Sequence, residues 1–388
     1  MRKRKIKITV VSTTPVSGRP PKFIITLQKK YLVEFITRPG NQFLLTHLTK
    51  YKNIHIRQIG PDFSKKDILS QINFIIQSIF LIFFSNSKII YCFNLFSSPI
   101  GVFSKIFLNK KFICDATEFF GTEISINNTN NKLYEFIYYL KMIPILIADA
   151  STIAEPYPQN IPKYVKDKLI LIYNFPSSKL FNYNIEPNND FYKKYPLARN
   201  KKIIGYIGNV KYGLGLEKII KAFSKIENNV ILLIVGDILP SRNYKISKNY
   251  IEKYCDYYGV KNRVIITGYI EHTEYPSYCK VIDIGVIYLQ PLSDFWVNYS
   301  LPIKLFEYIA LGIPFVSTNF KTIKRFSNGC CLYVDPNNIK ELIDAFNILL
   351  NDNILYTSLK RNCIKKSCLY VWEKQEKLIF NIIDYVIN

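Results

Sequence analysis

The segment at residues 302–318, PIKLFEYIALGIPFVST, puts a cation and a carboxylate on the first turn of an otherwise apolar helix. Pro302 suits the start of a helix and Gly312 suits its end. Lys304 and Glu307 are three residues apart, so they share one face. A lysine at a helix N-terminus suits a diphosphate, and a carboxylate one turn later can accept hydrogen bonds from two vicinal ribose hydroxyls. An exposed Lys–Glu pair that contributes only to helix stability is the simpler alternative.

Three other segments end an apolar strand with glycine. GYIGNVKYGLG at 205–215 follows a strand and precedes a helix, so backbone N–H groups could approach a phosphate there. It matches neither the dinucleotide-binding G-x-G-x-x-G pattern nor a P-loop. VGD at 235–237 and TGYI at 267–270 could let a flat base lie against the main chain. Taken singly, each of these segments is equally typical of an ordinary turn.

The elements that must position these groups alternate between apolar strands and helical stretches, which indicates parallel sheets covered on both faces. In the first half, a strand at 5–12 is followed by a proline-rich loop and a helix-like stretch, which leads to the next strand at 54–59. The remaining predicted strands of the first half lie at 88–94, 111–117, 145–152 and 168–174, with helices at 68–84 and 131–142. In the second half, strands are predicted at 202–209, 230–237, 263–270, 283–289 and 313–318, with helices at 215–226, 247–258, 274–279, 302–312, 337–351 and 372–387.

The length of 388 residues and this alternation predict two domains of similar α/β construction. We predict a first Rossmann-like domain at 1–178, a linker at 179–200 and a second Rossmann-like domain at 201–365. A C-terminal helix at 366–388 is expected to cross back to the first domain. Ligands of doubly wound sheets bind at the carboxyl ends of the strands, so a site in a central cleft between the domains is expected.

The net charge of +23 is concentrated in the front half, where the first 66 residues hold only two acidic side chains. One basic face could meet anionic lipid, phosphorylated substrates or nucleic acid. A lysine-rich composition that merely solvates the surface explains the charge equally well. The longest apolar stretch, at 72–84, is shorter than the roughly 20 residues of a spanning helix, so it reads as a buried or interfacial helix.

Eight cysteines without a Cys-x-x-Cys pair, and only three histidines, disfavour a zinc site. No secretory signal is recognised, since the first apolar run is too short for one. Cysteines within apolar segments fit a reducing compartment, so a cytoplasmic location is expected.

Five segments together resemble the retaining GT-B nucleotide-sugar glycosyltransferases of family 4, also called glycosyl transferases group 1. They are GYIGNVKYGLGLEKIIKAF, LLIVGD, RVIITGYI, NYSLPIKLFEYIALGIPFVST and WEKQEKLI, in this order and spacing. The first half resembles the family only through CDATEFFG, ADAST and LILIYNFPSSKLF. The resemblance implies a GT-B fold, with a donor held mostly by the second domain and an acceptor held mostly by the first.

Site residues follow from the resemblance position by position. Glu307 matches the ribose-binding glutamate of the Glu-x7-Glu pattern, and Lys304 matches a phosphate-binding lysine. With these two, Asp115 and Glu118 of the DATE segment are assigned to catalysis. Substrate-binding positions implied by the family motifs are Gly208, Asn209, Lys211, Gly236, Gly268, Tyr269, Ile270, Asn298, Tyr299, Ser300 and Leu305.

Four positions depart from the family pattern. Tyr299 stands where many members have the first glutamate, Asn209 where an arginine is usual, and Leu214 where a lysine is usual. Thr117 stands where members often have a histidine that touches the donor sugar. Lys211 could replace one of the missing cations, but these departures leave the identity of the donor sugar undetermined.

The resemblance implies transfer of a hexose-type sugar with retained configuration, from a UDP- or GDP-linked donor to a saccharide or lipid-linked acceptor, without a required metal or other cofactor. A basic front half would suit peripheral contact with the anionic inner face of the cell membrane. Three alternatives stay open: a catalytically weak nucleotide-sugar-binding protein, a nucleotide-sugar 2-epimerase, which the scarcity of histidine disfavours, and a nucleic-acid binder, for which no recognised module is present.

Overall fold

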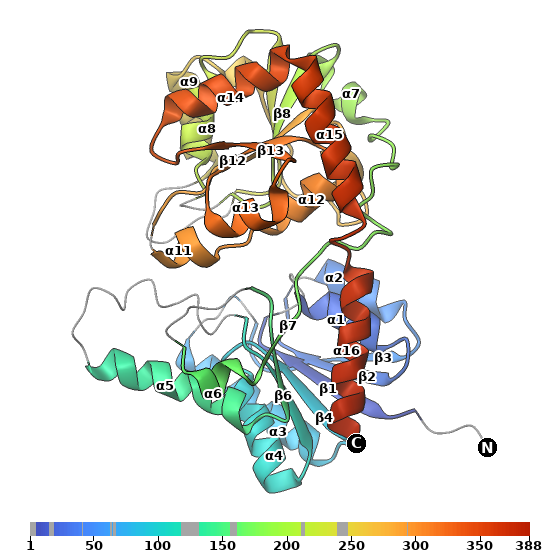
Figure 1. Cartoon of the computed structure of the whole chain (residues 1–388). Helices are drawn as coiled ribbons and strands as arrows, with labels where there is room; N and C mark the ends of the chain where they lie inside the picture. The colour runs from blue at the N-terminus through green and yellow to red at the C-terminus, as the bar shows by residue number, and fades with distance from the viewer. Residues whose placement is uncertain are drawn as a thin grey trace. The chain divides into compact units, whose positions relative to one another are not determined.

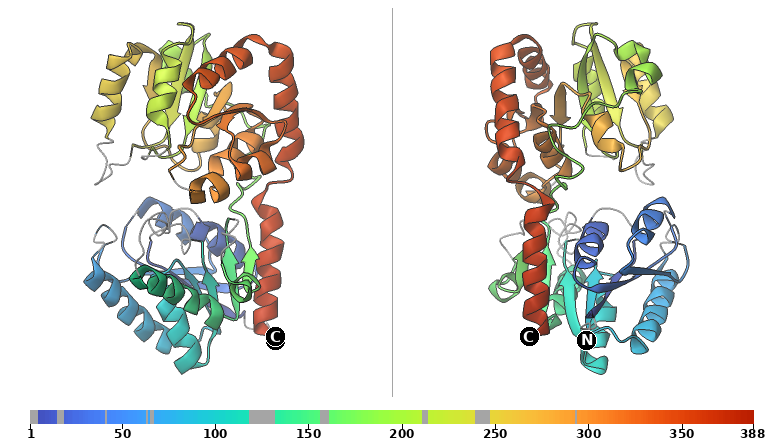
Figure 2. Two further views of the ribbon diagram at one scale, coloured as in Figure 1. Left: turned by 60° about the vertical axis from the view of Figure 1, so that its left-hand side comes forward. Right: turned by 90° about the vertical axis from the view of Figure 1, so that its right-hand side faces the viewer.

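The chain forms two compact units, each built on a parallel sheet with helices on both faces (Figures 1 and 2). One unit comprises Met1–Asn174 with Lys374–Asn388, and the other Phe175–Glu373. The predicted class, α/β with two Rossmann-like units, is confirmed. The computed structural model describes residues 5–14, 19–40, 42–62, 64, 67–117, 132–155, 161–210, 214–238, 247–292 and 294–388.

The first unit holds a seven-stranded sheet in the order β3-β2-β1-β4-β5-β6-β7, with every pair parallel. The direction of strand addition reverses between β1 and β4, which is the topological switch point of a doubly wound sheet. The strands are β1 (Lys7–Ser12), β2 (Leu32–Thr37), β3 (Ile54–Gln58), β4 (Ile89–Phe93), β5 (Lys111–Asp115), β6 (Ala150–Ile153) and β7 (Leu169–Leu171).

The helices of the first unit cover both faces of this sheet (Figure 1). They are α1 (Arg19–Leu27), α2 (Gln42–Thr49), α3 (Ile68–Phe83), α4 (Ser98–Leu108), α5 (Lys132–Ile147), α6 (Lys163–Lys166) and most of α16 (Trp372–Ile387). In α16, Glu376 accepts hydrogen bonds from Thr26 at 3.3 Å and from Lys29 at 2.6 Å. Residues 374–388 therefore pack against α1 although they are far from it in sequence.

The prediction of a loop and one helix-like stretch before 54–59 misses strand β2, and the part of the loop at Pro20 and Pro21 is helical, while Pro15 and Gly18 lie outside the described residues. Helix α1 begins at Arg19 and includes two prolines in its first turn, where a missing N–H breaks no intrahelical bond. The next element is strand β2, which carries Glu34 among apolar residues. Because that carboxylate interrupts the apolar pattern, the segment does not read as a strand.

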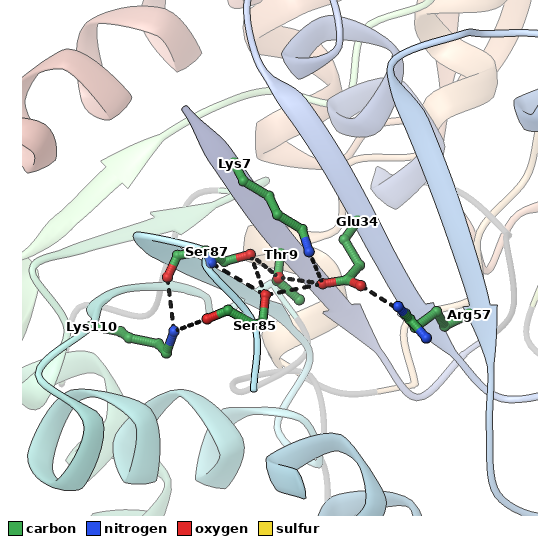
Figure 3. Close-up of polar contacts among 7 residues, drawn as sticks. All are labelled: Lys7, Thr9, Glu34, Arg57, Ser85, Ser87 and Lys110. Atoms are coloured by element: carbon green, nitrogen blue, oxygen red, sulfur yellow. Dashed lines mark hydrogen bonds and ion pairs between the residues drawn. The ribbon is translucent and has the colours of Figure 1, made fainter. Parts of the chain in front are cut away.

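Glu34 is buried and its charge is neutralised by the neighbouring strands (Figure 3). The Lys7 ammonium lies 2.9 Å and the Arg57 guanidinium 2.7 Å from its oxygens, and Thr9 donates a hydrogen bond at 3.2 Å. Burial alone would raise the pKa of this carboxyl, but the bonds from Lys7 and Arg57 outweigh it and lower the pKa. Lys110 closes the same polar cluster, which lies near the amino-terminal ends of the strands, by donating to backbone carbonyls before β4.

The second unit holds a six-stranded parallel sheet in the order β10-β9-β8-β11-β12-β13. Its switch point lies between β8 and β11. The strands are β8 (Lys202–Ile207), β9 (Val230–Val235), β10 (Val264–Ile266), β11 (Ile284–Ile287), β12 (Phe315–Thr318) and β13 (Cys331–Val334). The helices are α7 (Phe191–Lys194), α8 (Leu216–Phe223), α9 (Lys248–Tyr257), α10 (Tyr275–Cys279), α11 (Asp294–Tyr299), α12 (Ile303–Leu311), α13 (Lys321–Ser327), α14 (Ile339–Asn351) and α15 (Asn353–Ser367), with 3-10 turns at Pro196–Ala198 and Lys261–Arg263.

Candidate functional site

Three glycines form a row at the carboxyl ends of β8, β9 and β10. Gly208, Gly236 and Gly268 all have positive φ, at 90°, 146° and 69°. Gly236 packs so closely on Gly208 that an added Cβ would lie 2.4 Å from the Gly208 carbonyl oxygen, and Gly236 also pairs with Gly268 in an isolated bridge. The three predicted glycine segments are therefore adjacent in space, and their surface is formed by main chain.

The amides of the first of these turns are largely committed to the sheet. Gly208 N–H donates to Val235 O at 2.9 Å, and Val210 N–H donates to Asp237 O at 2.9 Å. These two amides are not available to a phosphate while the bonds persist. Among the described residues of this turn, the Gly208 and Val210 amides therefore hold the turn to the sheet instead of facing a phosphate.

Helix α12 is fixed on the sheet by Tyr308. Its hydroxyl donates to Gly205 O of β8 at 2.7 Å and accepts from Val286 N of β11 at 3.3 Å. The ring fills the space over Gly285, where any Cβ would come within 2.8 Å of it. Pro302 caps the helix rather than forming its first residue, and Gly312 closes it with a left-handed φ of 70°.

Lys304 reaches from α12 to the end of β8. Its Nζ lies 3.5 Å from the centroid of the Tyr206 ring, a cation–π contact, and an added Cβ on Gly208 would stand 4.0 Å from the same nitrogen. Burial lowers the pKa of the Lys304 amine to about 7, although the Glu307 carboxylate acts in the opposite direction. An anion bound beside Gly208 would favour the charged form and so bind preferentially to the ammonium.

Glu307 lies on the same helix and faces α10. The Tyr275 hydroxyl donates to Glu307 Oε2 at 3.5 Å, a long hydrogen bond. Burial, followed by the proximity of Glu307, raises the pKa of Tyr275 well above its usual value, so the phenol stays protonated and remains a donor. This contact orients a half-buried carboxylate, a group that can accept several hydrogen bonds at once.

The remaining predicted positions of the second unit surround these groups or continue their segments. Asn209 is exposed and its carbonyl accepts from the Tyr206 hydroxyl at 3.2 Å, while Tyr269 is exposed and Ile270 half-buried beside Gly268. Asn298, Tyr299 and Ser300 are half-buried just before α12, and Ser300 O accepts from Thr322 Oγ1 at 2.5 Å. Leu305 is fully buried and its amide donates to Pro302 O, so its side chain packs in the core. Lys211 lies outside the described residues.

In the first unit, the buried carboxylate of Asp115 ends β5 and is already paired. Arg19 Nε lies 2.7 Å and Thr152 Oγ1 2.8 Å from its Oδ2, and Thr117 N–H donates to Oδ1 at 3.2 Å. The Arg19 guanidinium also donates to the Ile172 carbonyl. Asp115 therefore holds three neighbouring segments together in this structure. Glu118 lies outside the described residues.

Three tyrosines of the site were not identified from the sequence: Tyr206, Tyr275 and Tyr308. Tyr206 and Tyr308 stand in apolar segments that read as ordinary packing, and Tyr275 stands in a polar segment with no recognisable motif. The described residues contain no group of three or more metal-ligating side chains, and none of their helices has the length and apolarity that spanning a bilayer requires.

Comparisons with known proteins agree with this architecture. Residues 188–366 match the family model described as "Glycosyl transferases group 1". An uncharacterized glycosyltransferase of Methanocaldococcus jannaschii is 25% identical over 229 residues, which cover 56% of this chain and 54% of that relative. The chain thus spans about half the length of this curated relative.

Two solved structures extend the likeness to nearly the whole chain. Sucrose-phosphate synthase from Thermosynechococcus elongatus superposes with a TM-score of 0.76 at 16% identity, covering 99% of both chains. Anabaena HepE, solved in complex with UDP, gives a TM-score of 0.74 at 13% identity and covers 98% of this chain and 100% of its own.

Two Rossmann-like parallel-sheet units of this order define the GT-B class of glycosyltransferase folds. The match to the glycosyl transferases group 1 model spans a little under half of the chain and includes the glycine row, Lys304 and Glu307.

Proposed function

We propose that the chain is a glycosyltransferase that moves a hexose-type sugar from a nucleotide-diphosphate sugar to a saccharide or lipid-linked saccharide acceptor. The observation that carries this proposal is the Lys304 amine, held against the Tyr206 ring beside the side-chain-free turn at Gly208. A buried amine whose pKa is depressed gains most from a fixed anionic partner. The UDP bound to the structurally similar HepE makes a nucleoside diphosphate the natural candidate for that anion.

The donor would lie along the glycine row of the second unit. Lys304 would bind the diphosphate, and Glu307, oriented by Tyr275, would accept hydrogen bonds from the ribose hydroxyls. The base would lie near Gly268, where the space beside the backbone is open among the described residues. Residues 201–365 would thus serve the donor and residues 1–178 the acceptor.

The chemistry would be displacement at the anomeric carbon with retention of configuration. The bond from that carbon to the diphosphate oxygen breaks, a bond to an acceptor hydroxyl oxygen forms on the same face, and the leaving diphosphate takes the acceptor proton. Lys304 would stabilise the charge that develops on the departing diphosphate, which is the role that favours the transition state. No nucleophilic side chain is assigned in this path.

The proposals for the acceptor and for the location of the enzyme are based on the net positive charge of the first unit, not on the geometry of the site. We propose that the enzyme works in the cytoplasm, at the inner face of the cell membrane, where a lipid-linked saccharide would be presented. The excess of basic residues in the first unit supports attraction to an anionic leaflet.

A thermal-shift panel of UDP-, GDP- and ADP-sugars tests the donor assignment first. At least one nucleotide sugar should raise the melting temperature, and that compound should then release its nucleoside diphosphate when saccharide acceptors are added. NMR of the product's anomeric proton reports the configuration. Donor binding without transfer to any acceptor would favour the alternative of a catalytically weak binding protein, and the absence of any shift would contradict the donor site.

A further inference from the structure

Helix α3 exposes several large apolar side chains, while two of its four buried residues are serines. The buried positions include Ser70 and Ser78, alongside Phe74 and Ile82. The outward-facing positions are each 60–78% exposed and are Ile68, Leu69, Ile76, Phe80 and Phe83. Phe84, which follows the helix, is also exposed and packs edge-on against Phe80 and Phe83. A helix that only covered a sheet would bury its large apolar side chains against the sheet and expose its serines to solvent.

The neighbouring helix α4 also exposes large apolar side chains. Helices α3 and α4 pack side by side (Figures 1 and 2), and α4 presents Ile106 and Phe107, which are 58% and 69% exposed. Phe107 packs against Phe103 of the same helix, with the ring centroids 4.8 Å apart and the rings tilted by 35°. We call this surface, formed by the exposed residues of α3, Phe84, Ile106 and Phe107, the apolar face. Contiguous apolar surface of this kind marks a binding surface on soluble proteins.

Basic side chains outnumber acidic ones around the apolar face, although Asp67 caps α3 and Asp149 pairs with Lys105 and Lys111. Between Asp67 and Asp115 the sequence contains four lysines and no aspartate or glutamate. Lys88 follows α3, Lys105 lies in the last turn of α4, and Lys110 and Lys111 follow α4. Lys105 is paired with Asp149 at 3.0 Å, whereas Lys88 is exposed. Aromatic and aliphatic side chains bordered by lysines match the interfacial zone of an anionic bilayer.

We propose that the apolar face docks on the surface of a membrane that contains anionic lipids, with α3 lying in the interface. The 16 residues of α3 are too few to span a bilayer core, which requires about 20. An amphipathic helix of this length can instead bury its apolar side at the boundary between headgroups and acyl chains. This inference rests on the proposed function only for its biological purpose, which is access to a lipid-linked acceptor.

Vesicle co-sedimentation of the full chain tests the docking. Wild type should bind phosphatidylcholine vesicles that contain phosphatidylglycerol more tightly than vesicles of phosphatidylcholine alone. Combining Ile76→Gln, Phe80→Gln and Phe83→Gln should weaken binding at least about tenfold, because full burial of even one such side chain is worth about a factor of ten. Glutamine keeps the helix propensity high, so α3 should persist, and circular dichroism checks this.

A matched control removes equally exposed apolar side chains from helices elsewhere. Tyr257→Gln, Ile354→Gln and Tyr385→Gln replace residues that are 72–87% exposed, and this triple variant should bind vesicles as wild type does.

A salt titration separates the apolar from the electrostatic contribution. Wild type should still bind vesicles measurably in about 1 M NaCl, where the Debye length is about 3 Å, because the apolar contribution is not screened.

Several outcomes would overturn the proposal. These are wild type that does not bind anionic vesicles, an α3 triple variant that binds as wild type does, or binding abolished by salt alone. A wild-type dimer that the α3 substitutions dissociate would assign the apolar face to a second copy instead. Nucleotide-sugar binding by the α3 variant, which should be unchanged, separates failure of the docking from failure of the donor site.

Discussion

The pKa of Lys304 predicts a specific pH dependence of donor binding. With a pKa of about 7, roughly nine in ten amines are charged at pH 6 and roughly one in ten at pH 8. If only the ammonium binds the diphosphate, affinity should fall about tenfold, or about 1.4 kcal/mol, between these two pH values. The sign follows because a bound anion raises the pKa of Lys304, so binding takes up a proton and weakens as the pH rises.

Isothermal titration calorimetry with the nucleotide sugar chosen from the thermal-shift panel measures this slope. Both phosphates of such a donor are esterified or anhydride-linked, so the ligand's charge is constant over this range. Lys304→Met should bind weakly with no slope, and Lys304→Arg should lose the slope because a guanidinium stays charged. Lys324→Met, which removes another lysine near a tyrosine ring in the same unit, should keep it. Equal wild-type affinity at pH 6 and pH 8, or an undiminished slope in Lys304→Met, would refute the reasoning.

Two stability predictions concern groups that support the fold. Glu34→Ala should lower the free energy of unfolding by about 2–3 kcal/mol at pH 7, because Lys7 and Arg57 lose a buried partner. The pKa of Glu34 is lower in the folded state than its value of about 4.3 in the unfolded state. The stabilisation is therefore present above the unfolded pKa and is lost as the pH falls through the folded pKa. Urea melts of Glu34→Ala and wild type should accordingly converge in acid. Asp190→Ala, which breaks an exposed pair, should cost less than about 1 kcal/mol, and an equal cost for both would be contrary evidence. Gly236→Ala should destabilise by about 1–3 kcal/mol more than Gly259→Ala, because only the former meets a carbonyl oxygen at 2.4 Å; equal melting temperatures would show that the turn yields.

The alternation of apolar strands predicted the fold class because buried parallel strands are recognisable without knowledge of their neighbours. Strand β2 was not predicted because a buried charged residue interrupts its apolar sequence. Its Glu34 is tolerated only because Lys7 and Arg57 come from adjacent strands, and the local sequence carries no sign of that pairing. Likewise, α3 was recognised as a buried or interfacial helix, but its outward-facing aromatic residues became evident only from its packing.

The candidate site shows the same division. Lys304 and Glu307 were selected because they share one face on the first turn of an otherwise apolar helix and match the family pattern, and the fold places Lys304 beside the predicted Gly208 turn. Their partners Tyr206 and Tyr275 lie on other elements, distant in sequence, and nothing in the local sequence links either tyrosine to α12. The commitment of the Gly208 amide to β9 also depends on tertiary structure, so it could not be foreseen from a glycine-rich turn. The assigned roles of these residues stay predictions.

The most direct test of the donor site is the affinity and turnover of Lys304→Ala and Glu307→Ala with the selected nucleotide sugar, beside Lys324→Ala as control. Each site variant should lose about 10- to 150-fold in kcat/KM, the effect expected for one hydrogen bond to a charged group, while the control stays within about twofold of wild type. Unchanged kinetics in both site variants, with folding intact, would contradict the assignment of the donor to α12 and the glycine row.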